Sequence, residues 1–395
     1  MKILHVNTYN TGGAAKACLR LHEALLDNGV DSKVLVRNKT VHSTREVYEV
    51  WEELNYIEKG KKYLAQKQLD KKQQKIIKVL GPADELFSFP ESIWDLTTHP
   101  LFEWADIIHL HWVAGFVDYK TFFTNSNKQI VWTIHDEEPF SGGFHYPPNL
   151  SISSYDDRIK EHLSIKENAF KNQAITVVSP SQFLADKSKG SALFSSFDHE
   201  VIKNCADTKN YFYQDKETSR KQLGLPLDNK MILFVSGTLD YTRKGYAQLL
   251  EATPSLLDET TILCTVGRQN GVVSMDTAVH LGSFDSEEKM SQAYAAADLL
   301  VVPSLMDNLP NTISEALCCG VPIVAFNTGG IPEMINNESG ILCEADVNSL
   351  EDALNRGLKM EWNREGISKI GHRLFGQEEC AVKYIEVYSK VCNVH

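Results

Sequence analysis

The sequence predicts an α/β protein with two Rossmann-like domains, each built on a parallel sheet. Short runs rich in Val, Ile and Leu alternate with longer stretches of helical pattern, which is typical of βαβ units around a buried parallel sheet. The chain has 395 residues, more than one hydrophobic core usually organises. The series of short apolar runs starts afresh near residue 231, so a second sheet is expected there.

The first domain opens with a clear βαβ unit. Residues 3–6 predict a strand, residues 11–15 a small-residue turn and residues 17–26 a helix. Gly29 predicts the end of that helix, because glycine accepts the backbone conformation found there. Further strands are expected at residues 33–36, 106–110, 130–134 and 174–178.

The second domain repeats this alternation. The polar segment 208–229 carries Gly224 and Pro226 and is the predicted linker into this domain. Apolar residues recur at helical spacing in residues 380–391. We therefore expect domains at 1–207 and 208–375, with a helix at about 376–395 packing back on the first. Strands of the second domain are expected at residues 231–235, 262–266, 279–281, 299–302 and 322–326.

Charge and composition exclude several classes of protein. The net charge of -12 argues against nucleic acid as the main partner, since phosphate backbones need a basic surface. The eight cysteines show no CxxC spacing of the kind that builds zinc sites or redox pairs. A reducing cytosol is therefore the expected environment. No apolar stretch approaches the ~20 residues of a membrane span, and the first residues lack a signal-peptide pattern. A cytoplasmic protein is expected.

One segment departs from the acidic average. Residues 59–78 contain eight lysines opposed only by Asp70. Two interpretations stay open: a solvated helix face, or peripheral contact with an anionic surface at the inner face of a membrane. The lysines are Lys59, Lys61, Lys62, Lys67, Lys71, Lys72, Lys75 and Lys78.

The most informative window, residues 303–326, reads PSLMDNLPNTISEALCCGVPIVAF. It predicts a strand, a polar loop and a helix with Pro310 in its first turn and Gly320 at its end. The N–H groups around Asn311 and Thr312 would favour an anion. Glu315 shares a helix face with Asn311, and the loop residues Asp307 and Asn308 reach the same space. Taken alone, Glu315 could be an ordinary helix-surface glutamate or a partner of the helix dipole, and Asp307 and Asn308 a simple capping turn. Taken together, these residues fit a site for a diphospho-sugar.

This window resembles the donor site of the retaining glycosyltransferases of family 4 (GT4), which have the GT-B fold of two Rossmann-like domains facing across a cleft. The family carries two acidic residues eight positions apart, and Asp307 and Glu315 have that separation. Aspartate stands here where glutamate is commoner. The resemblance implies that Glu315 holds the ribose of the nucleotide and that Asp307 contacts the transferred sugar.

Two further segments resemble the family's donor-binding elements. Residues 236–252, SGTLDYTRKGYAQLLEA, resemble the strand, loop and helix that carry a basic pair for the diphosphate. The match implies Lys244, with Arg243 as the second cation and Gly237 at the strand end, while Thr238 replaces the usual arginine. Taken alone, an Arg-Lys pair is usually a solvated loop. The resemblance also implies that the loop Gly282, Ser283 and Phe284 lies beside the nucleobase.

The first domain carries weaker matches. Gly12 and Gly13 resemble the family's glycine-rich loop, although such a pair is most often a turn. Residues 132–147, WTIHDEEPFSGGFHYP, resemble a bacterial polysaccharide-biosynthesis branch and imply that His135 faces the transferred sugar; a structural histidine is the alternative. Segments 109–116 and 179–186 fit the same branch. Phe144 stands where that branch often has cysteine, so no metal or redox role is expected there.

The resemblance implies transfer of a hexose-type sugar from a nucleotide sugar to a saccharide or lipid-linked acceptor, in surface polysaccharide synthesis. We expect retention by front-face attack, with His135, Asp307, Lys244 and Arg243 as the catalytic set. No Asp-x-Asp triplet stands at a strand end, so neither a metal nor a cofactor is expected. The basic pair and the helix N-terminus near Asn311 would meet the diphosphate charge instead.

Two other functions stay open at this point. A hydrolysing nucleotide-sugar epimerase has the same architecture and releases nucleotide without an acceptor. A non-catalytic protein that binds nucleotide sugars belongs to a different class and would bind the donor without consuming it. A flavin or nicotinamide enzyme is disfavoured, because no G-x-G-x-x-G opens the first helix.

Overall fold

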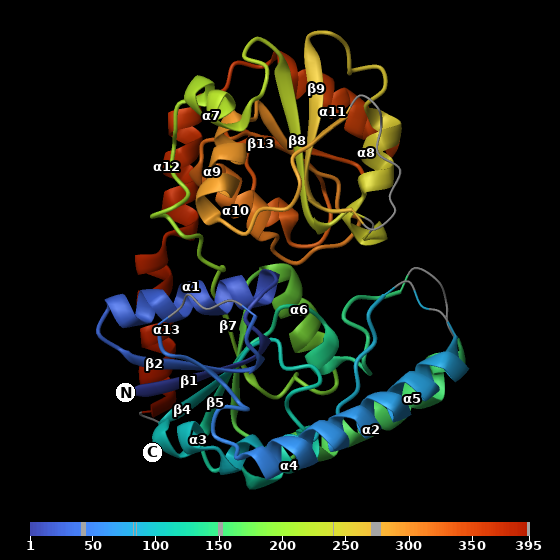
Figure 1. The fold of residues 1–395 in the computed structure, drawn as a ribbon, viewed down its shortest axis with the longest axis vertical. Helices are drawn as coiled ribbons and strands as arrows, with labels where there is room; N and C mark the ends of the chain where they lie inside the picture. The colour runs from blue at the N-terminus through green and yellow to red at the C-terminus, as the bar shows by residue number, and fades with distance from the viewer. Residues whose placement is uncertain are drawn as a thin grey trace. The chain divides into compact units, whose positions relative to one another are not determined.

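The computed structural model describes residues 1–40, 45–81, 83, 85–148, 153–239, 241–269 and 278–392. It divides the chain into two compact units, Met1–Ile202 with Ala381–His395 (unit 1) and Lys203–Cys380 (unit 2). In each unit, helices cover both faces of one parallel sheet (Figure 1). The predicted α/β class with two Rossmann-like sheets is confirmed.

The sheet of unit 1 has seven strands in the order β3-β2-β1-β4-β5-β6-β7, and every pairing is parallel. Its central strands are almost wholly buried and rich in Val, Ile and Leu, because helices cover both faces. The edge strands β3 and β7 were not predicted, since neither contains a continuous apolar run. The strands are β1 (Lys2–Tyr9), β2 (Asp31–Asn38), β3 (Val47–Glu49), β4 (Ile107–Leu110), β5 (Gln129–Thr133), β6 (Ile175–Ser179) and β7 (Asp198–Val201).

The first helix of unit 1 starts earlier than the sequence predicted. The first helix begins at Gly13, so residues 13–15 are helical and not part of a turn. Gly12 takes the N-cap position with φ 98°, which glycine adopts without strain. The helices are α1 (Gly13–Asp27), α2 (Tyr56–Leu80), α3 (Pro100–Trp104), α4 (Tyr119–Asn125), α5 (Asp156–Phe170), α6 (Gln182–Gly190) and most of α13 (Gln377–Cys392).

The last helix, α13, is bonded into the core of unit 1. The hydroxyl of Tyr388, wholly buried, lies 2.6 Å from Nδ1 of His109 on β4. The hydroxyl of Tyr384 lies 2.8 Å from Oγ1 of Thr133. These two bonds tie the C-terminal helix to the central strands.

The sheet of unit 2 has six parallel strands in the order β10-β9-β8-β11-β12-β13. Counted within the unit, this is the 3-2-1-4-5-6 order of a dinucleotide-binding fold. The last strand, β13, was not predicted. The strands are β8 (Lys230–Thr238), β9 (Thr261–Arg268), β10 (Ala278–His280), β11 (Leu299–Val302), β12 (Ile323–Phe326) and β13 (Gly340–Cys343).

The segment predicted as a linker contains a helix of unit 2, α7 (Lys216–Leu223). Its Arg220 is 1% exposed and donates 2.7 Å to Asp298, the residue just before β11. Asp298 also accepts from the backbone N–H of Met231 at 2.8 Å. A buried ion pair therefore anchors the segment predicted as linker and entry into the second domain to the sheet of unit 2. The other helices are α8 (Tyr246–Ala252), α9 (Glu287–Ala296), α10 (Asn311–Cys318), α11 (Val347–Lys359) and α12 (Arg364–Phe375).

Within the described residues, no helix is both long enough and apolar enough to cross a bilayer. The longest, α2, has 25 residues, none of them buried. It begins with a capping box in which Asn55 and Glu58 bond each other's backbone N–H groups. This cap defines the start of the predicted lysine-rich helix, which the structure confirms.

Replacing Arg220 with alanine should destabilise unit 2 by about 3 kcal/mol, because a buried carboxylate loses its closest partner. Hydrogen exchange of the amides of β8 and β11 measures this loss. Lys221→Ala is the matched control, since Lys221 pairs with Glu217 on the exposed side of α7 and its loss should change little. Equal exchange in both variants would show that Arg220 does not anchor α7.

Unit 1 should lose stability when the pH falls below about 6.5. Burial lowers the pKa of His5, His109 and His111 well below the usual value, so the unfolded chain binds protons that the folded unit does not. The free energy of unfolding should fall by about 1.4 kcal/mol per pH unit for each of them. Denaturant unfolding followed by tryptophan fluorescence reports mainly on unit 1, which holds five of the six tryptophans, Trp51, Trp94, Trp104, Trp112 and Trp132; Trp362→Phe removes the signal of unit 2. Identical midpoints at pH 7.5 and 5.5 would contradict this.

Candidate functional site

Each sheet has one place where its strand order reverses. In unit 1 this lies between β1 and β4, and in unit 2 between β8 and β11. Ligands of open parallel sheets bind beyond the carboxyl ends of the strands at such a point, because the loops on its two sides turn away from each other. Lys244 and Asp307 are found in the loops after β8 and β11, and the other predicted residues lie in these or other parts of the two units.

In unit 2, the loops after β8 and β11 meet through an ion pair. The ammonium of Lys244 donates to Oδ2 of Asp307, whose side chain is almost wholly buried. Beside it, the guanidinium of Arg243 donates to the carbonyl of Met306 at 3.0 Å. The N–H of Leu305 donates to the carbonyl of Arg243 at 2.9 Å. The structure therefore places both predicted cations, Arg243 and Lys244, in contact with the loop that carries Asp307.

Two glycines allow these loops to approach so closely. Gly245 has φ +72°, and a Cβ there would lie 1.7 Å from the carbonyl oxygen of Pro303. Gly329 has φ +58°, and its Cβ would lie 1.9 Å from the carbonyl oxygen of Asp307. Any side chain at either position would push the backbone apart. Gly245, which follows Lys244, is therefore required by the close packing of these loops.

Glu315 lies on α10 and is 3% exposed. Its Oε2 accepts from the hydroxyl of Tyr294 on α9 at 2.9 Å. Burial, followed by the charge of Glu315, raises the pKa of Tyr294 well above its usual value, so this hydroxyl stays a donor. The alternative that Glu315 is an ordinary helix-surface glutamate is therefore wrong. Its carboxylate is buried and oriented.

Helix α10 starts one residue later than predicted. Pro310 is its N-cap with ψ 121°, an extended conformation, and Asn311 is the first helical residue. Asn311 and Thr312 are half-buried in the first turn. The positive end of the helix dipole is consequently placed at Asn311 and Thr312, one residue beyond the proline.

The remaining predicted donor residues also lie in unit 2. Asn308 is 3% exposed, and its N–H donates to Oδ1 of Asp307 at 3.0 Å. Gly237 is exposed near the end of β8. Gly282, Ser283 and Phe284 follow β10, and the carbonyl of Gly282 accepts from the N–H of Gly267 at 2.9 Å. An open hollow between α7 and α9 shares no residue with this set.

In unit 1, His135 follows β5 and is partly exposed. Its Nε2 lies 3.3 Å from Nδ1 of His111, the residue after β4. Burial lowers the pKa of His135 to about 4, so the ring is neutral at physiological pH. Gly12 and Gly13 are exposed at the start of α1.

The three acids after His135 are all paired. Asp136 accepts from Nδ1 of His145 at 2.7 Å, and Glu137 from Lys187 at 2.5 Å. Glu138 pairs at 2.7 Å with Lys166, which is wholly buried. Burial alone would raise the pKa of Asp136, but the charge and hydrogen bond of His145 hold it below its usual value. These pairs anchor the loop that carries His135.

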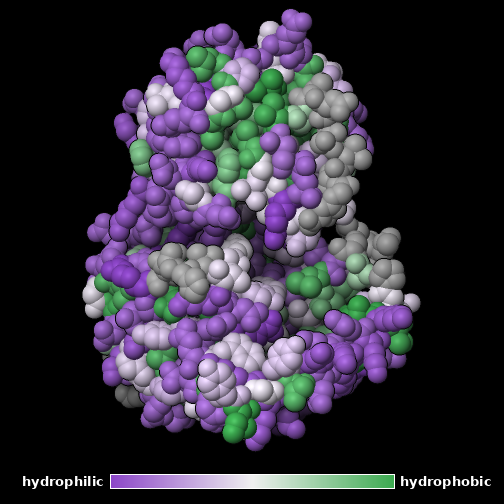
Figure 2. Space-filling view, in the orientation of Figure 1, coloured by the Kyte–Doolittle hydropathy of each residue, from purple (hydrophilic) through white to green (hydrophobic). Residues whose placement is uncertain are grey.

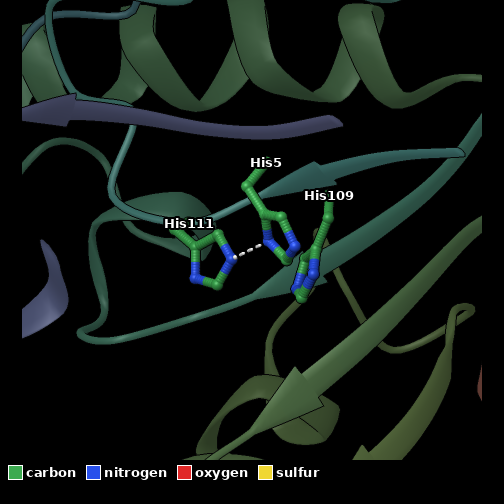
Figure 3. A group of neighbouring side chains, drawn as sticks. All are labelled: His5, His109 and His111. Carbon is green, nitrogen blue, oxygen red and sulfur yellow. Dashed lines mark hydrogen bonds between the residues drawn. The ribbon is translucent and has the colours of Figure 1, made fainter. Parts of the chain in front are cut away.

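Three histidines of unit 1, His5, His109 and His111, were assigned no role from the sequence. His5 on β1 and His109 on β4 are neighbours in register, and His5 Nδ1 lies 3.0 Å from His111 Nε2 (Figure 3). Both His5 and His109 interrupt apolar strands in the sequence. Such a polar residue in a buried strand indicates a buried hydrogen bond, so the sequence did contain a signal.

Among the described residues, His5, His109 and His111 form a group whose ligand atoms lie within 4.8 Å of one another. Both ring nitrogens of His109 are already bonded to hydroxyls, at 2.6 Å to Tyr388 and at 2.7 Å to Thr133. The charged neighbours that affect His5 and His111 are other histidines and no carboxylate. A divalent cation would be buried here without a balancing charge, which is costly. The geometry favours a hydrogen-bonded cluster.

Comparison with known proteins connects the unit 2 site to a family. Residues 215–373 match the model of "Glycosyl transferases group 1". The chain is 28% identical over 256 residues to the uncharacterized glycosyltransferase MJ1607 of Methanocaldococcus jannaschii, covering 59% of this chain and 60% of the relative. It is 27% identical over 220 residues to the putative teichuronic acid biosynthesis glycosyltransferase TuaC of Bacillus subtilis, covering 53% and 54%. The chain thus spans little more than half the length of these relatives.

The fold extends further than the sequence match. The crystal structure of Anabaena Alr3699/HepE in complex with UDP-glucose superposes with a TM-score of 0.65 at 19% identity, covering 99% of this chain and 100% of that one. Similarity at this identity shows the fold. The chain therefore has the two-domain GT-B fold, and residues 215–373 match the glycosyl transferases group 1 family model.

Proposed function

We propose that the chain is a retaining, GT4-type glycosyltransferase that moves a hexose-type sugar from a nucleotide sugar to a saccharide or lipid-linked acceptor in surface polysaccharide synthesis. One observation carries the proposal: Lys244, Asp307 and Glu315 lie beside the strand-order reversal of a group 1 glycosyltransferase domain. The UDP-glucose bound by HepE supports a nucleotide-sugar donor. The teichuronic acid named for TuaC supports a polymer as the product.

The diphosphate would bind where positive charge is concentrated in unit 2. Departure of a nucleoside diphosphate builds negative charge on its oxygens, and groups that meet this charge lower the barrier. Lys244 and Arg243 supply cations, and the first turn of α10 at Asn311 and Thr312 supplies N–H groups. We propose that these groups act in place of a metal.

The Lys244–Asp307 pair suggests how the donor is recognised. A phosphate oxygen competes with the carboxylate of Asp307 for the ammonium of Lys244, which has three donors. Once the ammonium turns to phosphate, Asp307 can accept from a hydroxyl of the transferred sugar. The buried carboxylate is thereby paired both before and after the donor binds.

Glu315 would bind the ribose of the nucleotide. The hydroxyl of Tyr294 orients its carboxylate, and an ionised carboxylate can accept from both hydroxyls of a ribose. The loop of Gly282, Ser283 and Phe284 would lie beside the base, with Gly237 and Asn308 near the phosphates and sugar. Base and sugar identity are then decided by contacts in these loops.

Unit 1 would contribute His135, Gly12 and Gly13 on the sugar and acceptor side. A neutral imidazole can bond a sugar hydroxyl without adding charge. A double displacement needs an available carboxylate nucleophile. Because Asp136, Glu137 and Glu138 are all paired, we favour front-face attack, in which the leaving phosphate oxygen takes the acceptor's proton.

Lys244→Met should lower kcat/KM for transfer by about 100-fold, because the leaving diphosphate loses its main cation. Glu315→Gln should raise the donor KM about tenfold, because one hydrogen bond to a charged acceptor is weakened. The donor is first chosen by thermal shift against a panel of nucleotide sugars. Transfer is then measured as nucleoside diphosphate release with acceptor, in excess EDTA.

Lys289→Met, on the exposed face of α9, is the matched control and should transfer at the wild-type rate. Wild-type rates in both site variants would exclude the assigned site. Loss of activity in EDTA would contradict the proposed metal independence. Nucleotide release that needs no acceptor would instead favour the epimerase, and the anomeric configuration of the product tests retention.

We also propose that helix α2 contacts an anionic membrane surface. Its outer face carries large apolar side chains, with Ile57 71% and Leu64 59% exposed. Lys71, Lys75 and Lys78 continue the same face at helical spacing, and no carboxylate pairs with them in the described part of the chain. Figure 2 shows mainly hydrophilic side chains over α2. Apolar anchors followed by lysines are typical of surface-bound amphipathic helices.

The inner side of α2 is anchored within unit 1. Lys62 donates to the carbonyl of Ile93 at 2.6 Å, and its ammonium lies 4.9 Å from the ring centre of Trp94. Ile76, Ile77 and Leu80 also pack against a buried aromatic cluster around Phe87, so the inner side holds the helix while the outer lysines extend into solvent. This division of roles lets the outer face be changed without unfolding the unit.

Binding to phosphatidylcholine vesicles should require phosphatidylglycerol. Reversing both Lys71 and Lys75 to glutamate should weaken binding about 30-fold or more, since each basic residue contributes about 1 kcal/mol at an anionic surface. Flotation with and without the anionic lipid measures this. The matched control, Lys289→Glu with Lys359→Glu in unit 2, should bind as wild type. Equal binding to both vesicle types would remove the proposal.

A further inference from the structure

Three histidines of unit 1 form a continuous hydrogen-bonded chain. Nδ1 of His5 lies 3.0 Å from Nε2 of His111, as Figure 3 shows, and Nδ1 of His111 lies 3.3 Å from Nε2 of His135. The chain runs from the middle of β1, through the residue after β4, to the residue proposed to face the sugar. Two imidazole rings therefore connect His135 to strand β1.

All three rings are neutral at physiological pH. His5 and His111 are almost wholly buried, and burial lowers the pKa of each well below its usual value. The groups facing them include His22, whose ring centre lies 6.0 Å from that of His5, and His109, which lies 4.2 Å from His111. Neither neighbour brings a negative charge. Each ring of the chain thus carries one proton.

A neutral histidine in the middle of such a chain forces one direction on it. His111 has one N–H and one lone pair, so it must accept from one neighbour and donate to the other. In the outward arrangement, His5 donates from Nδ1, His111 donates from Nδ1, and His135 accepts at Nε2. In the inward arrangement every bond is reversed. No mixed arrangement keeps both bonds.

The surroundings of His5, at the buried end of the three hydrogen-bonded histidines, decide between the outward and the inward arrangement. Nε2 of His5 is buried and has no hydrogen-bond partner within the described structure. The outward arrangement leaves a bare lone pair there, whereas the inward arrangement buries an N–H with no acceptor. For backbone groups, buried N–H groups without acceptors are rarer than incompletely satisfied acceptors, and we take the same order to hold for the buried ring of His5. The outward arrangement is therefore favoured.

We propose that His5 and His111 are positioning residues that hold His135 in the Nδ1–H tautomer, with its Nε2 accepting from His111. His135 then acts as a hydrogen-bond donor through Nδ1 and is not a base at that atom. This consequence for catalysis rests on the proposed sugar transfer. The tautomer itself does not, because the contacts within unit 1 determine it.

Long-range proton–nitrogen NMR spectra of the full chain, labelled with ¹⁵N-histidine, test the tautomer directly. His5, His111 and His135 should all show a protonated Nδ1 and a bare Nε2 at neutral pH. A protonated Nε2 on His135 in the wild-type protein would overturn the proposal. This measurement requires no variant and no activity.

Two substitutions of His111 separate positioning from folding. In His111→Asn, the amide nitrogen can take the place of Nδ1 and donate to His135, so the Nδ1–H tautomer should persist. In His111→Phe the donor is lost, and His135 should shift towards the Nε2–H form that dominates in free histidine. His22→Gln is the control, because His22 bonds Ser32 and Arg45 and lies outside the chain.

Kinetics provide the second readout. His111→Phe should lower kcat about tenfold, the effect of one hydrogen bond, with the donor KM unchanged, while His111→Asn restores the rate. Equal rates in the Phe and Asn variants would overturn the positioning role. A wild-type Nδ1–H tautomer in a protein that transfers no sugar would instead refute the proposed function and leave the tautomer assignment intact.

Discussion

The proposed chemistry depends on the point in each sheet where the strand order reverses. Parallel strands direct their carboxyl ends to one edge, and loops that leave neighbouring strands in opposite directions open a space between them. In unit 2 that space receives Lys244 from beyond β8, and Asp307 and Glu315 from beyond β11. Residues more than 60 positions apart are brought together by the topology alone.

The Lys244–Asp307 pair satisfies a constraint that any such site faces. A carboxylate this deeply buried is costly unless a cation or hydrogen-bond donors meet it. Here the ammonium of Lys244 and the N–H of Asn308 do so. Gly245 and Gly329 permit the approach of the backbones that carry them. In a ligand with both phosphate and hydroxyl groups, the phosphate can become the partner of Lys244 and a hydroxyl the partner of Asp307. Neither charge is then left without a partner.

Sequence reasoning succeeded where burial leaves a pattern. The central strands of both sheets are built on short apolar runs, and each was predicted within a few residues. Edge strands such as β3 and β7 lack that run, and α7 was hidden in a polar segment because a single buried arginine, Arg220, replaces an apolar face. Long-range ion pairs leave no local signal, since their partners lie far apart along the chain.

The candidate residues show the same division. Spacing and resemblance pointed to Lys244, Asp307, Glu315 and His135, but not to the burial of Glu315 or its bond from Tyr294. His5 and His111 escaped notice because their relation to His135 depends on strand register. Pairwise register between parallel strands separated by a hundred residues is a property of the folded sheet.

Hydrogen exchange with and without a nucleotide sugar tests the central claim most directly, because it reports where the diphosphate binds. The account predicts slower exchange at residues 242–245 and at the first turn of α10, with distant elements of unit 2 such as α12 unchanged. Protection elsewhere, with none in these two segments, would show that Lys244 and Asp307 do not hold the donor.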